Sequence, residues 1–151
     1  YGLMPPGCPD TVTPIHLRHV MNWYAKVIHE KVVPAGTSIS YGRHFSALAP
    51  TRVLTVSVGY ADGLSRRLSS GNFELLLMGK YHLPIIGNVC MDMCMVDASS
   101  IPSDVEIPPE CPIMIFGEEK SADLLASYLG TINYEITCVV GKRVQRIYSE
   151  E

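Results

Sequence analysis

Apolar and polar residues alternate over several stretches of this chain, which is the pattern of half-buried β-strands. In residues 20–33 the apolar Trp23, Ala25 and Val27 alternate with other side chains before a Pro-Ala-Gly turn. Residues 52–58 alternate more cleanly and are rich in β-branched side chains, which favour extended backbone. Both stretches are therefore predicted to be strands.

Shorter apolar runs predict the remaining strands. Residues 73–78 and 83–86 flank the pair Gly79-Lys80, and this arrangement predicts a hairpin. Additional strands are predicted at residues 89–96, 113–116 and 144–148. The last of these would close the chain, and the proline-rich residues 102–112 are predicted to be a loop.

One helix is predicted, near residues 121–129. Ser121 can cap its N-terminus, Asp123 lies in its first turn and Gly130 can end it. Residues 132–140 fit a helix and a strand equally well. Many short strands with one clear helix predict a mainly β fold, a barrel or a sandwich. The expected apolar face of the helix consists of Leu124, Leu125, Tyr128 and Leu129.

The N-terminal residues show no such pattern. Residues 1–14 contain four prolines and two glycines, which predicts an extended segment, and residues 15–151 are then predicted to form one β domain. A length of 151 residues suits a single core. Because the first residue is not Met and no signal peptide is recognisable, we expect a processed chain or a domain cut from a longer protein.

Composition excludes several classes of protein. Hydrophobic residues make up 47% and charged residues 18%, which is typical of a globular chain. The net charge of −3, without a cluster of Lys or Arg, argues against a nucleic-acid partner. No apolar stretch approaches the roughly 18 residues of a membrane helix. The five cysteines include no Cys-x-x-Cys pair, so we predict no metal site and expect the reducing cytoplasm as the compartment.

Five short motifs stand out, although each alone fits an ordinary turn, strand or helix end. Tyrosine lies beside glycine in several places, as in Tyr41-Gly42 and Gly59-Tyr60. A glycine lets a backbone or a ligand come close, and a neighbouring phenol can then reach into that space. The motifs are Ser-Tyr-Gly (40–42), Gly-Tyr-Ala-Asp-Gly (59–63), Cys-Met-Asp (90–92), Thr-Ile-Asn-Tyr-Glu (131–135) and Arg-Val-Gln-Arg-Ile-Tyr (143–148).

In this order and spacing, the motifs resemble the C-terminal domain of alanine racemase, and the resemblance covers essentially the whole chain. It implies a pyridoxal-phosphate enzyme whose N-terminal α/β barrel carries the cofactor lysine and most cofactor contacts. It also implies a head-to-tail homodimer in which this β domain covers the active site of the other subunit. The implied activity is the interconversion of L- and D-alanine, which supplies D-alanine for peptidoglycan.

The resemblance assigns roles to individual residues. Racemisation at Cα removes a proton from one face and returns one to the other, so two bases are needed. One is the barrel lysine, and by resemblance the other is Tyr41. Tyr134 matches the tyrosine that donates a hydrogen bond to the cofactor phosphate, and Met91 matches the residue whose N–H meets the substrate carboxylate. Positions that line a substrate access corridor are matched by Tyr60, Arg66, Asp92 and Ile132.

Two departures from the family change these expectations. Asn88 stands where many members have an arginine before the Cys-Met-Asp motif, so a corridor charge is absent. No lysine of this chain lies in the context of the cofactor lysine, and no glycine-rich phosphate loop is present. We therefore expect the chain alone to form no covalent link with pyridoxal phosphate and to be inactive.

Other functions stay open on sequence grounds. Serine racemases of the same family typically have a smaller polar residue in place of Tyr134, so its presence favours alanine. Fold-related pyridoxal-phosphate decarboxylases share the two-domain plan but lack this series of motifs. A free-standing β module for binding or dimerisation would show no tyrosines gathered at a cavity. A racemase domain is instead predicted to project Tyr41 and Tyr134 from exposed positions.

Overall fold

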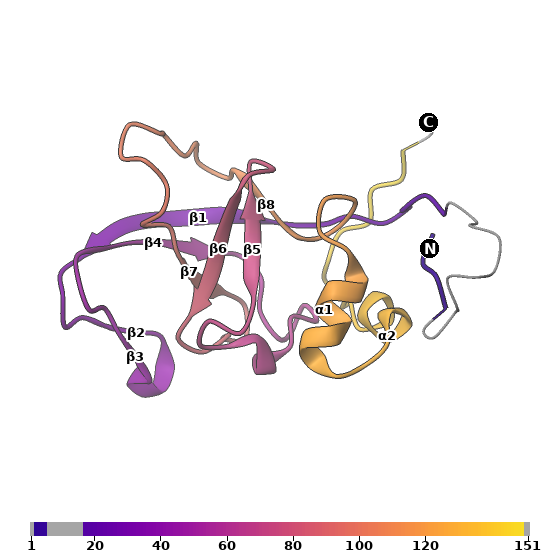
Figure 1. The fold of residues 1–151 in the computed structure, drawn as a ribbon, viewed down its shortest axis with the longest axis horizontal. Helices are drawn as coiled ribbons and strands as arrows, with labels where there is room; N and C mark the ends of the chain where they lie inside the picture. Colours follow the sequence, from indigo (N-terminus) through magenta and orange to yellow (C-terminus); the bar gives the residue numbers. More distant parts are fainter. Residues whose placement is uncertain (1, 6–16, 150–151) are drawn as a thin grey trace.

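The computed structural model describes residues 2–5 and 17–149, and its main feature is a closed barrel of antiparallel strands in the order β1-β4-β7-β6-β5-β8 (Figure 1). A separate two-stranded sheet is formed by β2 and β3. The prediction of a mainly β, barrel-like fold is confirmed. The strands span Trp23–Val33 (β1), Ser38–Ile39 (β2), Phe45–Ser46 (β3), Thr51–Val56 (β4), Glu74–Leu77 (β5), Tyr81–Ile86 (β6), Cys94–Asp97 (β7) and Pro112–Phe116 (β8).

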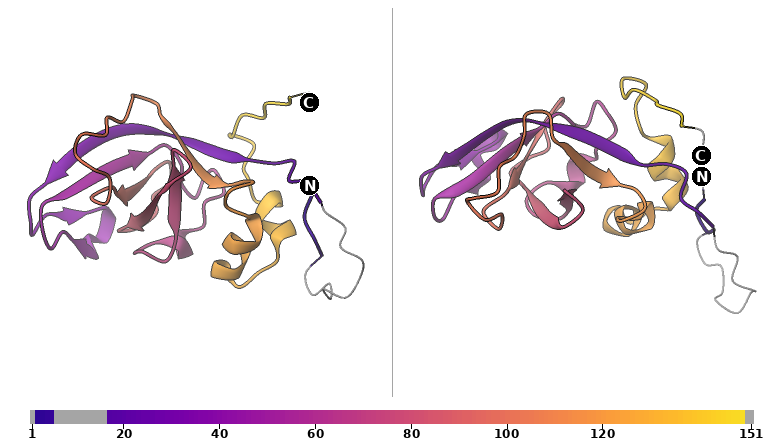
Figure 2. Two further views of the ribbon diagram at one scale, coloured as in Figure 1. Left: turned by 45° about the horizontal axis from the view of Figure 1, so that its top comes forward. Right: turned by 90° about the horizontal axis from the view of Figure 1, so that it is seen from above.

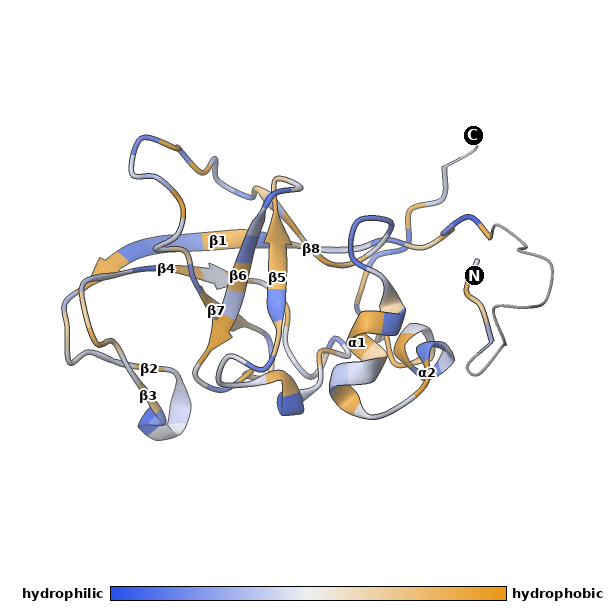
Figure 3. Cartoon of the chain, viewed as in Figure 1, coloured by the Kyte–Doolittle hydropathy of each residue, from blue (hydrophilic) through white to orange (hydrophobic). Residues whose placement is uncertain are grey.

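The long strand β1 closes the barrel. Its first residues pair with β8 and its later residues pair with β4, with a shift of register in each pairing. Such shifts bend a strand and let it serve two neighbours. Beyond its middle, residues 28–32 are exposed on both faces, and Figure 3 shows this part of β1 as largely hydrophilic. This exposed half of β1 pairs with β4 at the end of the barrel that lies towards β2 and β3 (Figure 1).

Two apolar clusters hold the domain together. The larger fills the barrel, where Trp23 packs edge-on against Phe116 with ring centroids 5.8 Å apart. The smaller lies at the β2–β3 sheet and anchors the turn between these strands to the barrel. It consists of Val33, Ile39, Ala47, Val53 and Ile86.

The helices α1 (Ala122–Leu129) and α2 (Asn133–Cys138) lie at the end of the long axis opposite β2 and β3 (Figures 1 and 2). The predicted helix is therefore present, and the ambiguous residues 132–140 contain a second one. The predicted apolar face of α1 is only half correct, because Leu124 and Tyr128 are exposed. The buried face consists of Ala122, Leu125, Ala126 and Leu129. No helix of the described residues is both long and apolar enough to cross a membrane.

The predicted closing strand at residues 144–148 is wrong. Barrel closure by β1 leaves the described barrel strands with no free edge for another strand. The guanidinium of Arg146 instead donates hydrogen bonds to the carbonyls of Val140, Gly141 and Val144, and these bonds curl the tail back on itself. The predicted strand at 89–96 is also shorter than expected, because residues 89–93 form a turn before β7.

The cap of α1 gives a first testable prediction. The hydroxyl of Ser121 accepts a hydrogen bond from the Leu124 N–H at 3.2 Å. We expect Ser121→Ala to lower the free energy of unfolding by about 1 kcal/mol, because one helical N–H loses its acceptor. Urea unfolding of the 151-residue chain would measure this loss. Ser127→Ala, which changes an exposed serine inside the same helix, should be neutral; an equal loss in both variants would contradict the capping role.

Candidate functional site

Tyr41 lies in a strained turn between β2 and β3. It begins the 3₁₀ helix η1 (Tyr41–Arg43), and its side chain is 78% exposed. Three residues next to it have positive φ: Ser40 at 68°, Gly42 at 79° and Arg43 at 53°. Residues other than glycine rarely adopt this conformation, and where they do the surrounding structure must hold them there. The turn therefore presents the phenol to the outside of the domain.

A hollow of about 490 Å³ lies next to Tyr41, and we call it the tyrosine hollow. Four residues that the resemblance singled out, Tyr41, Tyr60, Arg66 and Met91, line it together although the sequence separates them widely. The structure thus gathers two phenols and a guanidinium around one space. The complete lining is Tyr41, Tyr60, Arg66, Asn88, Val89, Cys90 and Met91.

The loops that carry Tyr60 and Met91 are bonded to each other through their backbones. The N–H of Tyr60 donates to the carbonyl of Cys90, and the N–H of Ala61 donates to that of Met91, both at 3.0 Å. This approach requires a glycine at position 59, because a Cβ there would lie 2.3 Å from the Met91 oxygen. The close contact fixes both loops at the rim of the hollow.

The N–H of Met91 is the donor that the resemblance assigns to a substrate carboxylate. Within the described residues the carbonyl of Met91 is used by Ala61, but no group accepts a hydrogen bond from its N–H. The side chain of Met91 is 52% exposed. Met91 lines the tyrosine hollow, and an unused backbone donor at such a place is suited to an anionic ligand.

Arg143 connects the two loops through a carboxylate of each, and no sequence pattern indicated this role. Its guanidinium donates to Asp92 Oδ1 at 2.6 Å and lies 3.4 Å from Asp62 Oδ1. The other oxygen of Asp62 accepts the Gly59 N–H at 2.9 Å. The hydrogen bond with Asp92, and then the charge of Asp62, raise the pKa of Arg143 above its ordinary value. We call Arg143, Asp62 and Asp92 the arginine clamp.

The clamp predicts a change in loop mobility. We expect Arg143→Gln to accelerate amide hydrogen exchange in residues 59–62 and 90–93, because the two loops lose their shared cation. Mass spectrometry of the deuterated 151-residue chain would show it. Arg146→Gln is the matched control, since Arg146 bonds only to the backbone carbonyls of Val140, Gly141 and Val144 and to neither carboxylate of the clamp. Unchanged exchange in both loops of Arg143→Gln would rule out the clamp.

Tyr134 and Ile132 lie elsewhere, at the start of α2. Tyr134 is 39% exposed and Ile132 is 47% exposed. The buried Asn133 between them donates its side-chain N–H groups to Asp123 at 2.6 Å and to the Met4 carbonyl at 2.8 Å. These bonds fix the first turn of α2 against α1. Tyr41 and Tyr134 are both exposed, as predicted, but they occupy opposite ends of the long axis (Figures 1 and 2).

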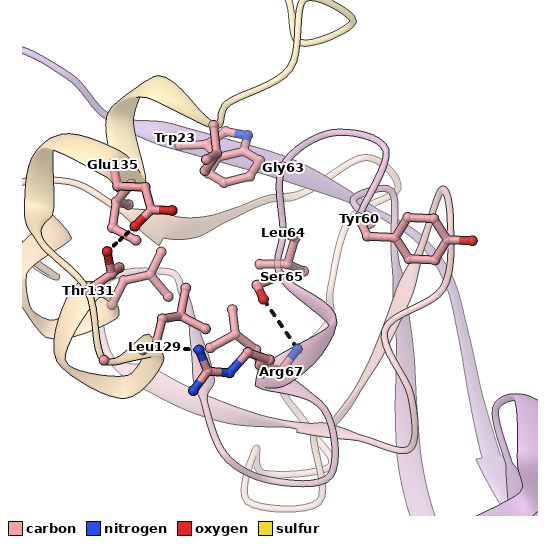
Figure 4. A pocket seen from close by; sticks show the side chains of 14 residues that line it. Trp23, Tyr60, Gly63, Leu64, Ser65, Arg67, Leu129, Thr131 and Glu135 are labelled. Carbon is pink, nitrogen blue, oxygen red and sulfur yellow. Dashed lines mark hydrogen bonds between the residues drawn. The ribbon is translucent and has the colours of Figure 1, made fainter.

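A second cleft, of about 540 Å³, lies between the 3₁₀ helix η2 (Arg66–Leu68) and the two α-helices. Figure 4 shows Arg67 on one side of it and Thr131 and Glu135 on the other, with Tyr60 at the far side. Arg67 is held there by the Leu129 carbonyl at 2.7 Å, and Thr131 donates a hydrogen bond to Glu135. Tyr60 lines both this cleft and the tyrosine hollow. Tyr134 and Ile132 line neither of these two spaces, so the structure keeps them apart from the residues of the tyrosine hollow.

Four cysteines lie among the described residues, and all of them are free thiols. Cys90, Cys94 and Cys111 are buried thiols, and Cys138 is an exposed one. Burial raises the pKa of the Cys94 thiol to about 12, so it stays protonated near neutral pH. No three His, Cys, Asp or Glu side chains in the described part of the chain gather in a way that could hold a metal ion.

Comparisons with known proteins show which family has this arrangement. Residues 20–148 match the family model "Alanine racemase, C-terminal domain". The chain is 43% identical to alanine racemase 2 of Caldanaerobacter subterraneus subsp. tengcongensis, over 98% of this chain and 37% of that protein. Thus it spans less than two fifths of the length of this relative.

Solved structures agree with the sequence match. The fold superposes on an alanine racemase of Bartonella henselae with covalently bound pyridoxal phosphate (TM-score 0.83, 31% identity), over 90% of this chain and 37% of that one. It also superposes on the alanine racemase of Clostridium difficile 630 in complex with cycloserine (TM-score 0.82, 36% identity), over 95% and 37%. This chain belongs to the alanine racemase family, as a C-terminal domain.

Proposed function

We propose that this chain is the C-terminal domain of a pyridoxal-phosphate-dependent racemase that interconverts L- and D-alanine and supplies D-alanine for peptidoglycan. In this proposal, Tyr41 acts as a base in the active site of the partner subunit of a head-to-tail homodimer. The observation that carries it is the tyrosine hollow, which is lined by Tyr41, Tyr60, Arg66 and Met91 and where the Met91 N–H has no acceptor among the described residues. We expect the enzyme in the cytoplasm.

Tyr41 suits a base that serves another domain. The residue is 78% exposed, so its hydroxyl can enter a neighbouring cavity. A free phenol has a pKa of about 10, so proton abstraction at neutral pH requires cations or hydrogen bonds that favour the phenolate. Arg66 brings one positive charge to the same hollow. The remaining support would come from the domain that closes over it.

Met91 and Arg66 suit the recognition of a small amino acid. The Met91 N–H would hold the substrate carboxylate and so orient Cα towards Tyr41. Arg66 and Tyr60 at the rim of the hollow would attract a zwitterion and direct it inward. Ile132 and Asp92, the other two corridor positions, do not line the hollow, and the carboxylate of Asp92 is engaged by Arg143. We therefore assign Asp92 to the arginine clamp, and we place Ile132 with Tyr134 at the start of α2.

Tyr134 fits a role towards the cofactor phosphate. No described residue takes a hydrogen bond from its hydroxyl, and the side chain is partly exposed at a firmly held helix start. A neutral phenol is a good donor to a phosphate oxygen. When bound, pyridoxal phosphate supplies an electron sink for the charge that develops at the substrate Cα. The cofactor itself would be held mainly by the N-terminal barrel.

The separation of Tyr41 from Tyr134 within the domain supports a dimeric enzyme. Tyr41 and Tyr134 lie at opposite ends of the domain, so one copy of this chain offers them to different surroundings. In a head-to-tail homodimer, Tyr134 would face the cofactor of its own subunit and Tyr41 that of the partner. A non-catalytic β module gives no reason for two phenols at one hollow. The bulky Tyr134 favours alanine over serine as the substrate.

A hybrid enzyme tests this function. It carries this chain in place of the matching C-terminal segment of the Clostridium difficile 630 alanine racemase. We expect the hybrid, loaded with pyridoxal phosphate, to convert L-alanine to D-alanine, and circular dichroism would follow the reaction. The 151-residue chain and the remaining segment of the other enzyme, each alone, should be inactive. A folded, cofactor-loaded hybrid without racemase activity would refute the proposed function.

A further inference from the structure

Asn88 is joined by two hydrogen bonds to the start of the Tyr41 turn, one from Ser40 and one to Tyr41. The hydroxyl of Ser40 donates to the carbonyl of Asn88 at 2.7 Å. In return, the side-chain amide of Asn88 donates to the carbonyl of Tyr41, also at 2.7 Å. The two residues are 48 positions apart in sequence. Two bonds in opposite directions hold the turn against the segment that leads to Met91, and we call this pair of bonds the latch.

The turn needs such restraint because its backbone is strained. Ser40 adopts φ 68° and ψ 173°, a region populated almost only by glycine. Gly42 and Arg43 also have positive φ. A strained conformation of this kind persists only where its surroundings over-determine it. Among the side-chain hydrogen bonds that Ser40 and Tyr41 make with described residues, the two with Asn88 are the shortest, at 2.7 Å.

The Tyr41 turn packs closely against the segment that contains Asn88. Gly87 lets the two segments meet, since a Cβ there would lie 2.6 Å from Cβ of Ser40. A Cβ on Gly42 would lie 3.4 Å from the Asn88 side-chain nitrogen. The segment is fixed on its other side, where the Val89 N–H donates to the Ser69 hydroxyl and that hydroxyl donates to the Arg66 carbonyl.

One short segment therefore sets the positions of several groups in the tyrosine hollow. Residue 88 holds the carbonyl of Tyr41, residue 89 is bonded through Ser69 to the backbone of Arg66, and residue 91 offers its free N–H. A shift of the Tyr41 turn relative to this segment would change the distance between the phenol and the Met91 N–H.

We propose that Asn88, with Ser40, is a positioning residue that fixes the Tyr41 hydroxyl relative to the Met91 N–H, and so sets the reach of the base to a bound amino acid. This inference rests on the proposed function and deepens it. It also gives Asn88 a role of its own: the short amide holds the turn that carries the base. An aspartate there could not donate to the Tyr41 carbonyl.

Asn88→Ala and Asn88→Asp in the hybrid enzyme test the catalytic part. Because a misplaced base weakens proton transfer more than substrate binding, we expect kcat to fall about 10- to 100-fold with little change in KM. The matched control is Asn72→Ala, an exposed asparagine outside the tyrosine hollow. An unchanged kcat in both Asn88 variants would overturn the proposal, and so would a raised KM with normal kcat, which would mark Asn88 as a corridor residue only.

Exchange measurements on the 151-residue chain separate failure of this inference from failure of the proposed function. We expect Asn88→Ala and Ser40→Ala to accelerate amide exchange in residues 40–44 while the thermal midpoint stays close to that of the parent chain. Unchanged exchange there would overturn the latch even in an active hybrid. Accelerated exchange beside an inactive parent hybrid would leave the latch standing and refute the racemase function alone.

Discussion

Tyr41→Phe in the hybrid enzyme is expected to lower kcat for alanine racemisation by about 100- to 10,000-fold, the usual contribution of a general base. Phenylalanine keeps the aromatic ring at this position and removes only the hydroxyl. The turn itself depends on backbone carbonyls and the Ser40 hydroxyl, none of which changes. The expected loss is therefore chemical and not structural.

Isotope exchange distinguishes a missing base from a damaged site. In D₂O, the Tyr41→Phe hybrid should still exchange the α-proton of one alanine enantiomer, because the barrel lysine still works from its own face. Exchange of the other enantiomer should stop. Tyr148→Phe, which changes a tyrosine that is 91% exposed on the tail, should leave both rates unchanged. Normal racemisation by Tyr41→Phe would remove Tyr41 from the mechanism.

Gly59→Ala is expected to have the largest effect on stability. The new Cβ would lie 2.3 Å from the Met91 oxygen and 2.4 Å from the Cys90 oxygen, and neither backbone atom can move aside cheaply. The two loops would have to separate, which breaks the bonds from Tyr60 and Ala61. Because overpacking of this kind is costly, we expect the free energy of unfolding to fall by about 3 kcal/mol.

Urea unfolding and hydrogen exchange of the 151-residue chain would measure both consequences. Gly71→Ala is the control, because Gly71 has a left-handed φ of 83° but nothing lies within 4 Å of the position that the new methyl group would take. Gly71→Ala should lose stability through backbone strain alone and leave exchange in residues 90–93 unchanged. A Gly59→Ala chain with parental stability and slow exchange in these residues would show that the two loops do not pack as described.

Most of the fold could be predicted because a strand or a helix leaves a pattern within a few consecutive residues. Alternation marked β1 and β4, and a serine cap with a following left-handed glycine marked α1. The failures concern relations between distant segments. Residues 144–148 have a strand-like pattern, but β1 already pairs with both β4 and β8, so no edge is available to them in the described barrel. That closure cannot be read from a local pattern.

The candidate site could likewise be predicted only in part. The resemblance singled out Tyr41, Tyr60, Arg66 and Met91, of which Arg66 lies outside the five motifs, and the structure brings these four together. The motifs did not show that Tyr134 lies at the other end of the domain. Arg143 and Asn88 act on partners about 50 positions away, through one or two hydrogen bonds. An isolated arginine or asparagine carries no sequence signal for such a contact.

Subunit complementation tests the central claim that Tyr41 serves the partner's active site. Two inactive hybrids would be mixed and allowed to exchange subunits: one with Tyr41→Phe, the other with the cofactor lysine of the barrel changed to alanine. If Tyr41 acts in trans, each mixed dimer regains one intact site, and random pairing restores about a quarter of the parental activity. If mixed dimers form and activity stays absent, Tyr41 does not serve the partner and the account is wrong.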